Sequence, residues 1–242
     1  MPDKREHRGP HPADAELFAP TLIPRLREAV TDFSLLLTKG YAEKSALKLV
    51  GDRFSLTQRQ RLAVMRSSCS DRQQQSRRAR SVPVEALAGQ PLAIDGYNLL
   101  ITIEAALSGG LIFQGRDGCL RDLASIHGTY HRVEETIPAV ELIGEFLRET
   151  RVASALWLLD SPVSNSGRLK TLIGQLAHES NWAWEIRLTI SPDAELSRMD
   201  TIVVSTDSVI LDACQRWTNL AAPIITRRLP QAPVIDLGTA IR

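Results

Sequence analysis

Short apolar segments that end at an aspartate are the feature that most constrains the fold of this chain. Residues 92–94 form one such segment, which stops at Asp95 and is followed by Gly96 and a long apolar stretch to residue 108. This order is typical of a buried strand, a tight turn and a buried helix, with a carboxylate at the carboxyl end of the strand. A lone aspartate there could equally be a helix cap. The same arrangement recurs along the chain, which favours a functional site over a helix cap.

Three later apolar segments repeat the arrangement, and helical patterns lie between them. Apolar strands that alternate with helices predict a mostly parallel sheet covered on both faces. We therefore expect an α/β fold, with residues 90–242 forming a three-layer α/β/α domain. Further strands are expected at residues 223–226 and 234–237. The three later segments and their aspartates are 155–159 with Asp160, 184–190 with Asp193, and 201–204 with Asp207.

The four aspartates should meet at one edge of the sheet, because parallel strands place their carboxyl ends on the same side. Crowded carboxylates repel one another and raise each other's pKa unless a cation lies among them. Mg²⁺ and Mn²⁺ are hard cations that take oxygen ligands, so either ion is the expected cofactor.

The charge of the chain is divided between a basic N-terminal part and an acidic remainder. Residues 1–84 hold 16 lysines and arginines against 9 acids, whereas residues 85–242 hold 13 against 19. We expect residues 1–20 to be a flexible tail and residues 21–84 to be a small all-α basic domain. Helical spacing predicts three helices, of which the second and third would make a helix-turn-helix-like pair. The three helices are expected at 22–37, 42–50 and from about 57 onward.

Arginine dominates the last part of this basic region. Residues 53–80 contain eight arginines and a single acid, Asp71. Because arginine matches phosphate geometry well, the pattern favours contact with a nucleic-acid backbone. The alternative is an ordinary solvated helix face followed by a linker. The candidate phosphate contacts are Arg72, Arg77, Arg78 and Arg80.

Three motifs resemble the PIN-like nuclease superfamily, in particular its NYN branch. They are Ile-Asp-Gly-Tyr-Asn-Leu-Leu at 94–100, Leu-Leu-Asp at 158–160 and Val-Val-Ser-Thr-Asp-Ser at 203–208. The resemblance implies a three-layer fold and metal-dependent cleavage of RNA. The order of the two parts, with a short basic helical domain in front, also resembles a little-characterised prokaryotic family of unknown function. The residues that the resemblance assigns to the site are Asp95, Asp160 and Asp207 as metal ligands and Asn98 as their polar partner.

Several other polar residues are candidates for the same site. Asp193 is a fourth possible ligand, and Glu104, on an apolar helix, needs either a metal shell or an arginine as its partner because a buried unpaired carboxylate is costly. Asp117 and Asp122 would extend the acidic site. Ser164 and Ser166 lie just before a predicted helix and could offer backbone N–H groups to a phosphate, with simple helix capping as the alternative.

The cysteines and histidines give weaker signals. Cys69, Cys119 and Cys214 are widely spaced, which favours reduced, buried thiols over disulfides or a zinc site. His127 and His131 have helical metal-ligand spacing, but no further ligand lies nearby in the sequence. No apolar run reaches the roughly 18 residues needed to span a bilayer, and the N-terminus lacks a signal-peptide core, so we expect a cytoplasmic protein.

The leading hypothesis is a Mg²⁺- or Mn²⁺-dependent ribonuclease whose basic N-terminal domain docks RNA. The first alternative is a non-catalytic RNA-binding or regulatory module with a vestigial acidic site. The second is a metal-dependent phosphatase that acts on a small molecule.

Overall fold

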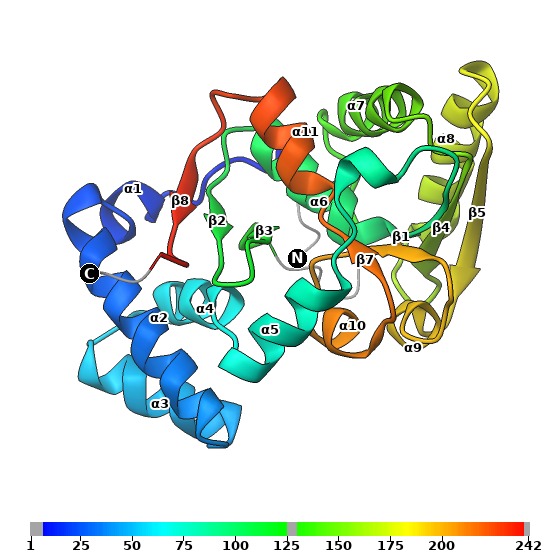
Figure 1. Cartoon of the computed structure of the whole chain (residues 1–242). Helices are drawn as coiled ribbons and strands as arrows, with labels where there is room; N and C mark the ends of the chain where they lie inside the picture. Colours follow the sequence, from blue (N-terminus) through cyan, green and yellow to red (C-terminus); the bar gives the residue numbers. More distant parts are fainter. Residues whose placement is uncertain (1–6, 125–129, 240–242) are drawn as a thin grey trace.

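A five-stranded parallel sheet forms the centre of the α/β part. The computed structural model describes residues 7–124 and 130–239. The strand order is β5-β4-β1-β6-β7, and each neighbouring pair is parallel (Figure 1). All five strands therefore end at the same edge. Their bounds are Pro91–Asp95 for β1, Ser154–Asp160 for β4, Trp184–Thr189 for β5, Ile202–Val204 for β6 and Trp217–Thr218 for β7.

Helices cover both faces of this sheet, as the sequence predicts. Alternate strand residues point to opposite faces: Leu92 and Ile94 pack with α6, α7, α8 and α11, whereas Ala93 packs with α9 and α10 (Figure 1). The expected α/β fold with a parallel sheet is confirmed. The first layer comprises α6 (Gly96–Leu107), α7 (Thr136–Glu149), α8 (Ser166–Glu179) and α11 (Ala221–Arg228), and the second α9 (Pro192–Leu196) and α10 (Ser208–Ala213).

A second, three-stranded sheet lies between the α/β part and the N-terminal helices. Its order is β3-β2-β8, with β3 antiparallel and β8 parallel to β2. Phe113 of β2 packs edge-on against Phe18, with 4.9 Å between ring centroids, in the core of the helical region. The two parts of the chain thus share a hydrophobic core. The bounds are Ile112–Gln114 for β2, Leu120–Arg121 for β3 and Val234–Asp236 for β8.

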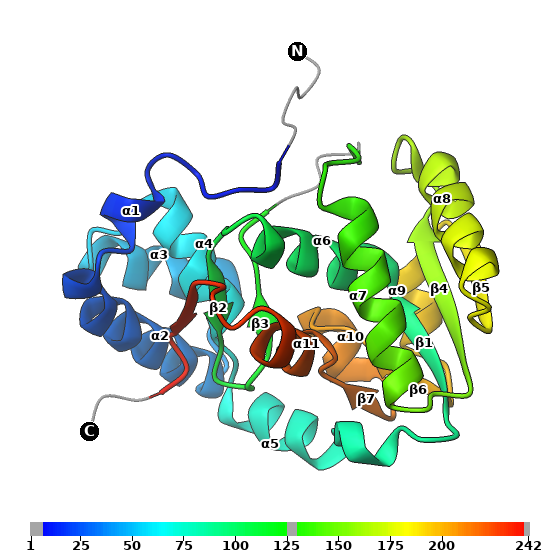
Figure 2. The same cartoon turned by 90° about the horizontal axis from the view of Figure 1, so that it is seen from above.

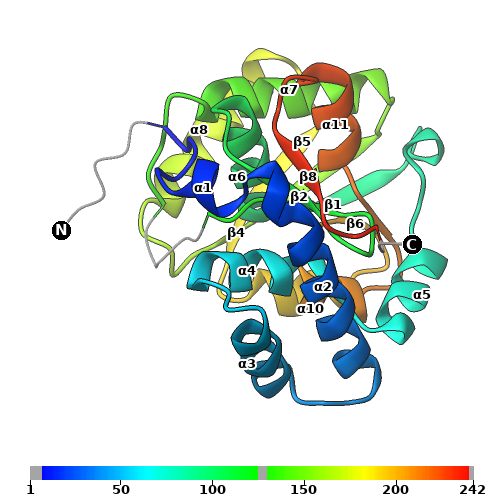
Figure 3. The same ribbon diagram turned by 90° about the vertical axis from the view of Figure 1, so that its left-hand side faces the viewer.

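The three predicted N-terminal helices are present, and a fourth follows them. Figure 3 shows α2, α3 and α4 grouped on one side of the molecule, and Figure 2 shows α5 between this group and β7. Ser70 and Gln73 start α5 with a capping box, a signal that the arginine content of the segment obscured. The bounds are Ile23–Thr38 for α2, Glu43–Arg53 for α3, Gln58–Ser67 for α4 and Asp71–Arg80 for α5.

Two expectations about local structure are wrong. The described residues of the expected N-terminal tail are ordered against the body: they include the helix α1 (Asp14–Leu17), and Asp14 is buried in an ion pair with Arg59. The strand expected at 223–226 is part of α11, where buried Ala221, Ile224 and Ile225 follow helical spacing. The apolar run there was too short to separate the two possibilities.

Among the described residues, no helix has the length and apolar character needed to cross a membrane.

Gly96, the residue after Asp95, is required by the close approach of α6 to β4. A Cβ at this position would lie 2.6 Å from Leu159 Cδ2 and 2.9 Å from the Leu158 carbonyl oxygen. We expect Gly96→Ala to destabilise the protein by about 1–3 kcal/mol, as overpacking of a core does. Gly167→Ala, in the first turn of α8 with open space around it, is the matched control and should leave stability equal or slightly higher. Urea unfolding of both variants measures the difference, and equal stabilities would contradict the assigned role.

Candidate metal centre at the acidic edge

Four aspartates lie at the carboxyl edge of the parallel sheet, and we call them together the acidic edge. Asp95 and Asp160 are the last residues of β1 and β4. Asp193 lies in the first turn of α9, which follows β5, and Asp207 is the residue before α10, which follows β6. The order β5-β4-β1-β6 makes these four strands consecutive neighbours.

Hydrogen bonds join the end of β1 and the first turn of α6 to the loop after β6. Ser205 Oγ donates to Asp95 Oδ2 at 2.8 Å and accepts from the backbone N–H of Asp207 at 3.0 Å. The backbone N–H and the hydroxyl of Thr206 both donate to Asn98 Oδ1, at 2.9 and 3.0 Å. Asp95, Asn98 and Asp207, which the sequence predicts to act together, are thus joined in one network.

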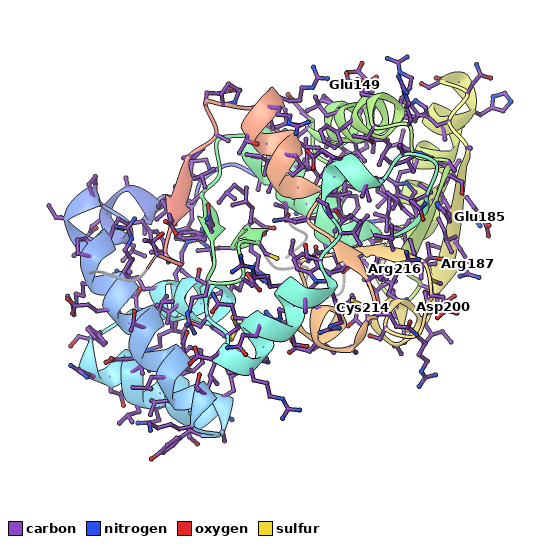
Figure 4. The ribbon with its side chains drawn as sticks, viewed as in Figure 1. Glu149, Glu185, Arg187, Asp200, Cys214 and Arg216 are labelled. Atoms are coloured by element: carbon purple, nitrogen blue, oxygen red, sulfur yellow. The ribbon has the colours of Figure 1, made fainter. Side chains whose placement is uncertain are left out.

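Asp193 is held over the central strands by α9. This helix packs against β1, β4 and α10. An ion pair between Arg187 of β5 and Glu195 of α9 ties the helix to the outer strand; Figure 4 labels Arg187. The aspartate whose role the sequence supported least therefore lies beside the other three.

Burial and mutual repulsion raise the pKa values of Asp95, Asp160 and Asp193. Burial raises the pKa of Asp95 to about 7, and the charges of Asp207 and Asp193 add to the rise, while the hydrogen bond from Ser205 opposes it. Burial, and then the charge of Asp193, raises the pKa of Asp160. Burial, and then the charge of Asp207, raises the pKa of Asp193. The expected rise in pKa is present at Asp95, Asp160 and Asp193.

The acidic edge offers ligand atoms that suit a hard divalent cation, although they do not form a closed cage. In the described part of the chain, no three His, Cys, Asp or Glu side chains are grouped closely enough to hold one ion together. Mg²⁺ commonly binds through only one or two carboxylates and keeps water or substrate phosphate as its remaining ligands. Asp95 and Asp207, joined through Ser205, are the pair that fits this mode.

Two buried arginines hold the backbone on either side of Asp207. Arg121 Nε donates to the Thr206 carbonyl at 2.7 Å, and Arg77 Nη2 donates to the Ser208 carbonyl at 3.4 Å. Both guanidinium groups contact Asp117, at 2.7 and 2.6 Å. Although burial opposes it, the charges of Arg121 and Arg77 lower the pKa of Asp117 well below its usual range. One buried network therefore positions the loop that carries Asp207.

This network corrects the expectation that Arg77 contacts a nucleic acid. Arg77 is 1% exposed and also pairs with Asp212. Arg80 is half-buried and donates to the Cys214 carbonyl, so it too serves the interior. Arg72 and Arg78 are exposed and form no ion pair within the described ranges.

Most other arginines of the basic run are paired as well. They face acids that lie outside the run in sequence but beside it in space, so a local count of charge overstates the free positive charge. The pairs are Arg53 with Asp32, Arg59 with Asp14, Arg61 with Asp52 and Arg66 with Asp122.

The extra acids do not extend the site. Glu104 is fully buried and pairs with Arg8 at 2.6 Å, so its partner is an arginine rather than a metal shell. Asp117 lies between the two buried arginines. Asp122 accepts from the Thr102 hydroxyl at 2.8 Å and lies 3.6 Å from Arg66. Each of these carboxylates has a structural partner.

The remaining candidates lie apart from the acidic edge or outside the described residues. The Ser164 carbonyl accepts from the backbone N–H of Tyr130, and Ser166 is buried at the start of α8. Neither serine caps this helix: Asn165 occupies the cap position and makes no side-chain capping bond. His127 is outside the described residues, so the His127–His131 pair has no structural account. The cysteines, as expected, are buried and free: Cys69, Cys119 and Cys214.

Sequence reasoning missed Ser205 and Arg121 as members of the site. Ser205 had a usable signal, since a serine two residues before a helix-capping aspartate at a strand end can reach the neighbouring strand's carboxylate. Arg121 had none, because its partners Asp117 and Thr206 come together only in the fold.

The pKa of Asp95 predicts how stability changes with pH. The folded-state pKa, about 7, lies above the value of about 4 in an unfolded chain, so the metal-free protein loses stability as pH rises from about 4 to about 7. Asp95→Asn removes this loss and keeps a good helix cap. The melting temperatures of both proteins are measured in EDTA. We expect the difference, variant minus parent, to be larger at pH 8 than at pH 5. Asp200→Asn, at the other end of β6, is the control; a difference that does not change with pH would contradict the prediction.

Removing the carboxylate of Asp117 should lower the free energy of unfolding far more than removing the exposed carboxylate of Asp71. Asp117→Asn leaves Arg77 and Arg121 buried without their shared anion, and such a loss typically costs about 3–5 kcal/mol. Asp71→Asn breaks an exposed pair with Arg116 and should cost under about 1 kcal/mol. Chemical denaturation compares the two, and similar losses would show that the buried network does not stabilise the fold.

Comparison with known proteins assigns the two parts of the chain separately. Residues 25–80 match a family described as a protein of unknown function (DUF434), and residues 84–223 match a domain of unknown function (DUF5616). A relative, the uncharacterized protein MJ0935 of Methanocaldococcus jannaschii, is 28% identical over 186 residues, which are 77% of this chain and 88% of that protein. No solved structure matches the chain. Since the second match covers more than half of the residues, the chain belongs to the DUF5616 family.

Proposed function

We propose that the acidic edge is the active centre of a Mg²⁺- or Mn²⁺-dependent nuclease that cleaves RNA phosphodiester bonds. The observation that carries the proposal is the buried carboxylate of Asp95, at the edge to which the neighbouring strands also bring Asp160, Asp193 and Asp207. Asp95 is buried, and within the described ranges it has no cationic partner. A buried carboxylate in this state is costly, and a divalent cation would offset the cost. The resemblance of the three motifs to the NYN branch of PIN-like nucleases supports the same chemistry.

The residues divide into ligands and orienting groups. Asp95 and Asp207 would hold the ion, with Asp160 and Asp193 beside them. A bound Mg²⁺ or Mn²⁺ supplies positive charge for the phosphate and lowers the pKa of water. Asp193, which is exposed, would accept a proton from the attacking water at its carboxylate. Asn98 keeps its Oδ1 on Thr206, which leaves Nδ2 available to a phosphate oxygen.

RNA docking would depend on fewer arginines than the sequence suggests. Arg72 and Arg78 are exposed on α5, the helix that packs against α10 next to Asp207. They are the candidates for phosphate contacts from the N-terminal region.

A metal-dependent phosphatase that acts on a small molecule is the second candidate. The observation in its favour is the pairing of Arg53, Arg59, Arg61 and Arg66 with acids of this chain, which removes most of the basic surface that a long RNA would need. The two candidates share the acidic edge and differ in their substrate.

Incubation of the purified protein with mixed RNA, in Mn²⁺ or in EDTA, tests the proposal. We expect cleavage only with Mn²⁺ and a loss on the order of 100-fold in Asp207→Asn, which keeps its cap on α10. Millimolar Mn²⁺ should also raise the melting temperature of the parent through linkage, and the Asp95→Asn/Asp207→Asn double variant should lose this rise.

Asp200→Asn is the control variant and should behave as the parent in both assays. Hydrolysis of p-nitrophenyl phosphate without cleavage of RNA would favour the phosphatase. A parent protein that binds RNA, cleaves neither substrate and melts at the same temperature with and without metal would contradict both activities and leave the non-catalytic RNA-binding module.

A further inference from the structure

A pocket of about 400 Å³ lies between the N-terminal helices and the α/β part, next to the acidic edge. Helices α2, α4 and α5 line it from one side, and α6 with residues 206–208 lines it from the other. Asn98 and Asp207, two members of the candidate centre, are part of its wall. Its volume is in the range of pockets that hold small ligands. Anything bound there would reach the acidic edge.

One wall of this pocket is apolar and is built from both parts of the chain. Its members are Phe33 and Leu37 of α2, Met65 of α4 and Ile101 of α6. Aromatic and aliphatic side chains of this kind suit a flat, poorly hydrated ring system.

The arginines that line the pocket are already neutralised by this chain. Arg66 lies against Asp122, and Arg77 and Arg121 share Asp117. The pocket therefore lacks the free positive charge that a phosphate site requires. Its chemistry favours an uncharged ring over a phosphate.

Two donors of the pocket wall have no partner within the described part of the chain. The Tyr97 hydroxyl is buried and has no hydrogen-bond partner, and only 5% of the residue is exposed. Asn98 must present Oδ1 to the Thr206 N–H, so its Nδ2 group is left without an acceptor. The Asn98 amide is half-buried and is the donor that a ligand in the pocket can reach, so ring or hydroxyl acceptors of a ligand would satisfy it.

We infer that this pocket binds the base and ribose of one nucleotide of single-stranded RNA, whose phosphate then lies at the Asp207 end. The inference rests on the proposed function, since it names a subsite for the substrate of that centre. The apolar wall covers the base, Asn98 Nδ2 donates one of its two N–H groups to an acceptor of the base or the ribose, and the acidic edge meets the adjoining phosphate. Recognition of an unstacked base in this way requires a single strand.

The test compares intact RNA with RNA that has no bases. Binding of five-nucleotide oligoadenylate and oligouridylate is measured by calorimetry in Ca²⁺, beside a ribose-phosphate pentamer without bases. We expect the parent to bind at least one intact pentamer about tenfold or more tightly than the abasic one. Leu37→Trp fills the pocket and should remove this preference, whereas Leu35→Trp, on the same helix but 52% exposed, should keep it. Met65→Trp fills the same space from α4 if Leu37→Trp does not fold.

Tyr97→Phe examines the free hydroxyl. Because that hydroxyl is buried without a partner in the fold, its loss should leave the melting temperature equal or higher and the affinity for intact RNA unchanged. Equal affinity of the parent for intact and abasic pentamers, or a preference that survives both pocket-filling variants, would overturn the inference. A preference for bases in a protein that cleaves no RNA in Mn²⁺ would support the subsite and refute the nuclease.

Discussion

The carboxylate of Asp117, shared by Arg77 and Arg121, is the interaction on which the candidate site depends. It is buried, and its two partners come from α5 and β3, which belong to different parts of the chain. Through these arginines the same anion fixes the carbonyl groups on both sides of Asp207. Breaking such a group leaves uncompensated buried charges, so the docking of the helices and the geometry of the acidic edge should be lost together.

This arrangement gives a physical reason for joining a basic helical region to an acidic α/β domain. Arg8, Arg66 and Arg77 of the N-terminal part pair with acids of the α/β part, which are Glu104, Asp122, and Asp117 with Asp212. The charge division along the sequence is therefore in part complementarity within the fold, beyond any role in binding RNA. The shared core around Phe18 and Phe113 adds apolar burial to this electrostatic match. The pocket beside Asp207 exists because the two parts meet there.

Repulsion within the acidic edge explains why these carboxylates need a rigid frame. Asp95 is held by Ser205 and by the N-terminus of α6, yet burial and two neighbouring carboxylates still raise its pKa. Gly96 lets α6 begin directly against β4, which fixes the position of Asp95 over the central strand. The cost of crowding like charges is thus offset by close packing elsewhere.

The sequence by itself determined the parallel sheet and the placement of Asp95, Asp160, Asp193 and Asp207 at its edge. Both follow from local rules: apolar runs with the length of strands, helices between them, and the shared direction of parallel strands. Only the tertiary structure decided what the arginines do and which acids matter, because ion pairs such as Arg77–Asp117 join residues that are distant in sequence. Whether a short segment forms a strand or a helix could not be decided from the sequence for the same reason. Residues 223–226 could form a strand or a helix until their packing against α6 and α7 selected the helix.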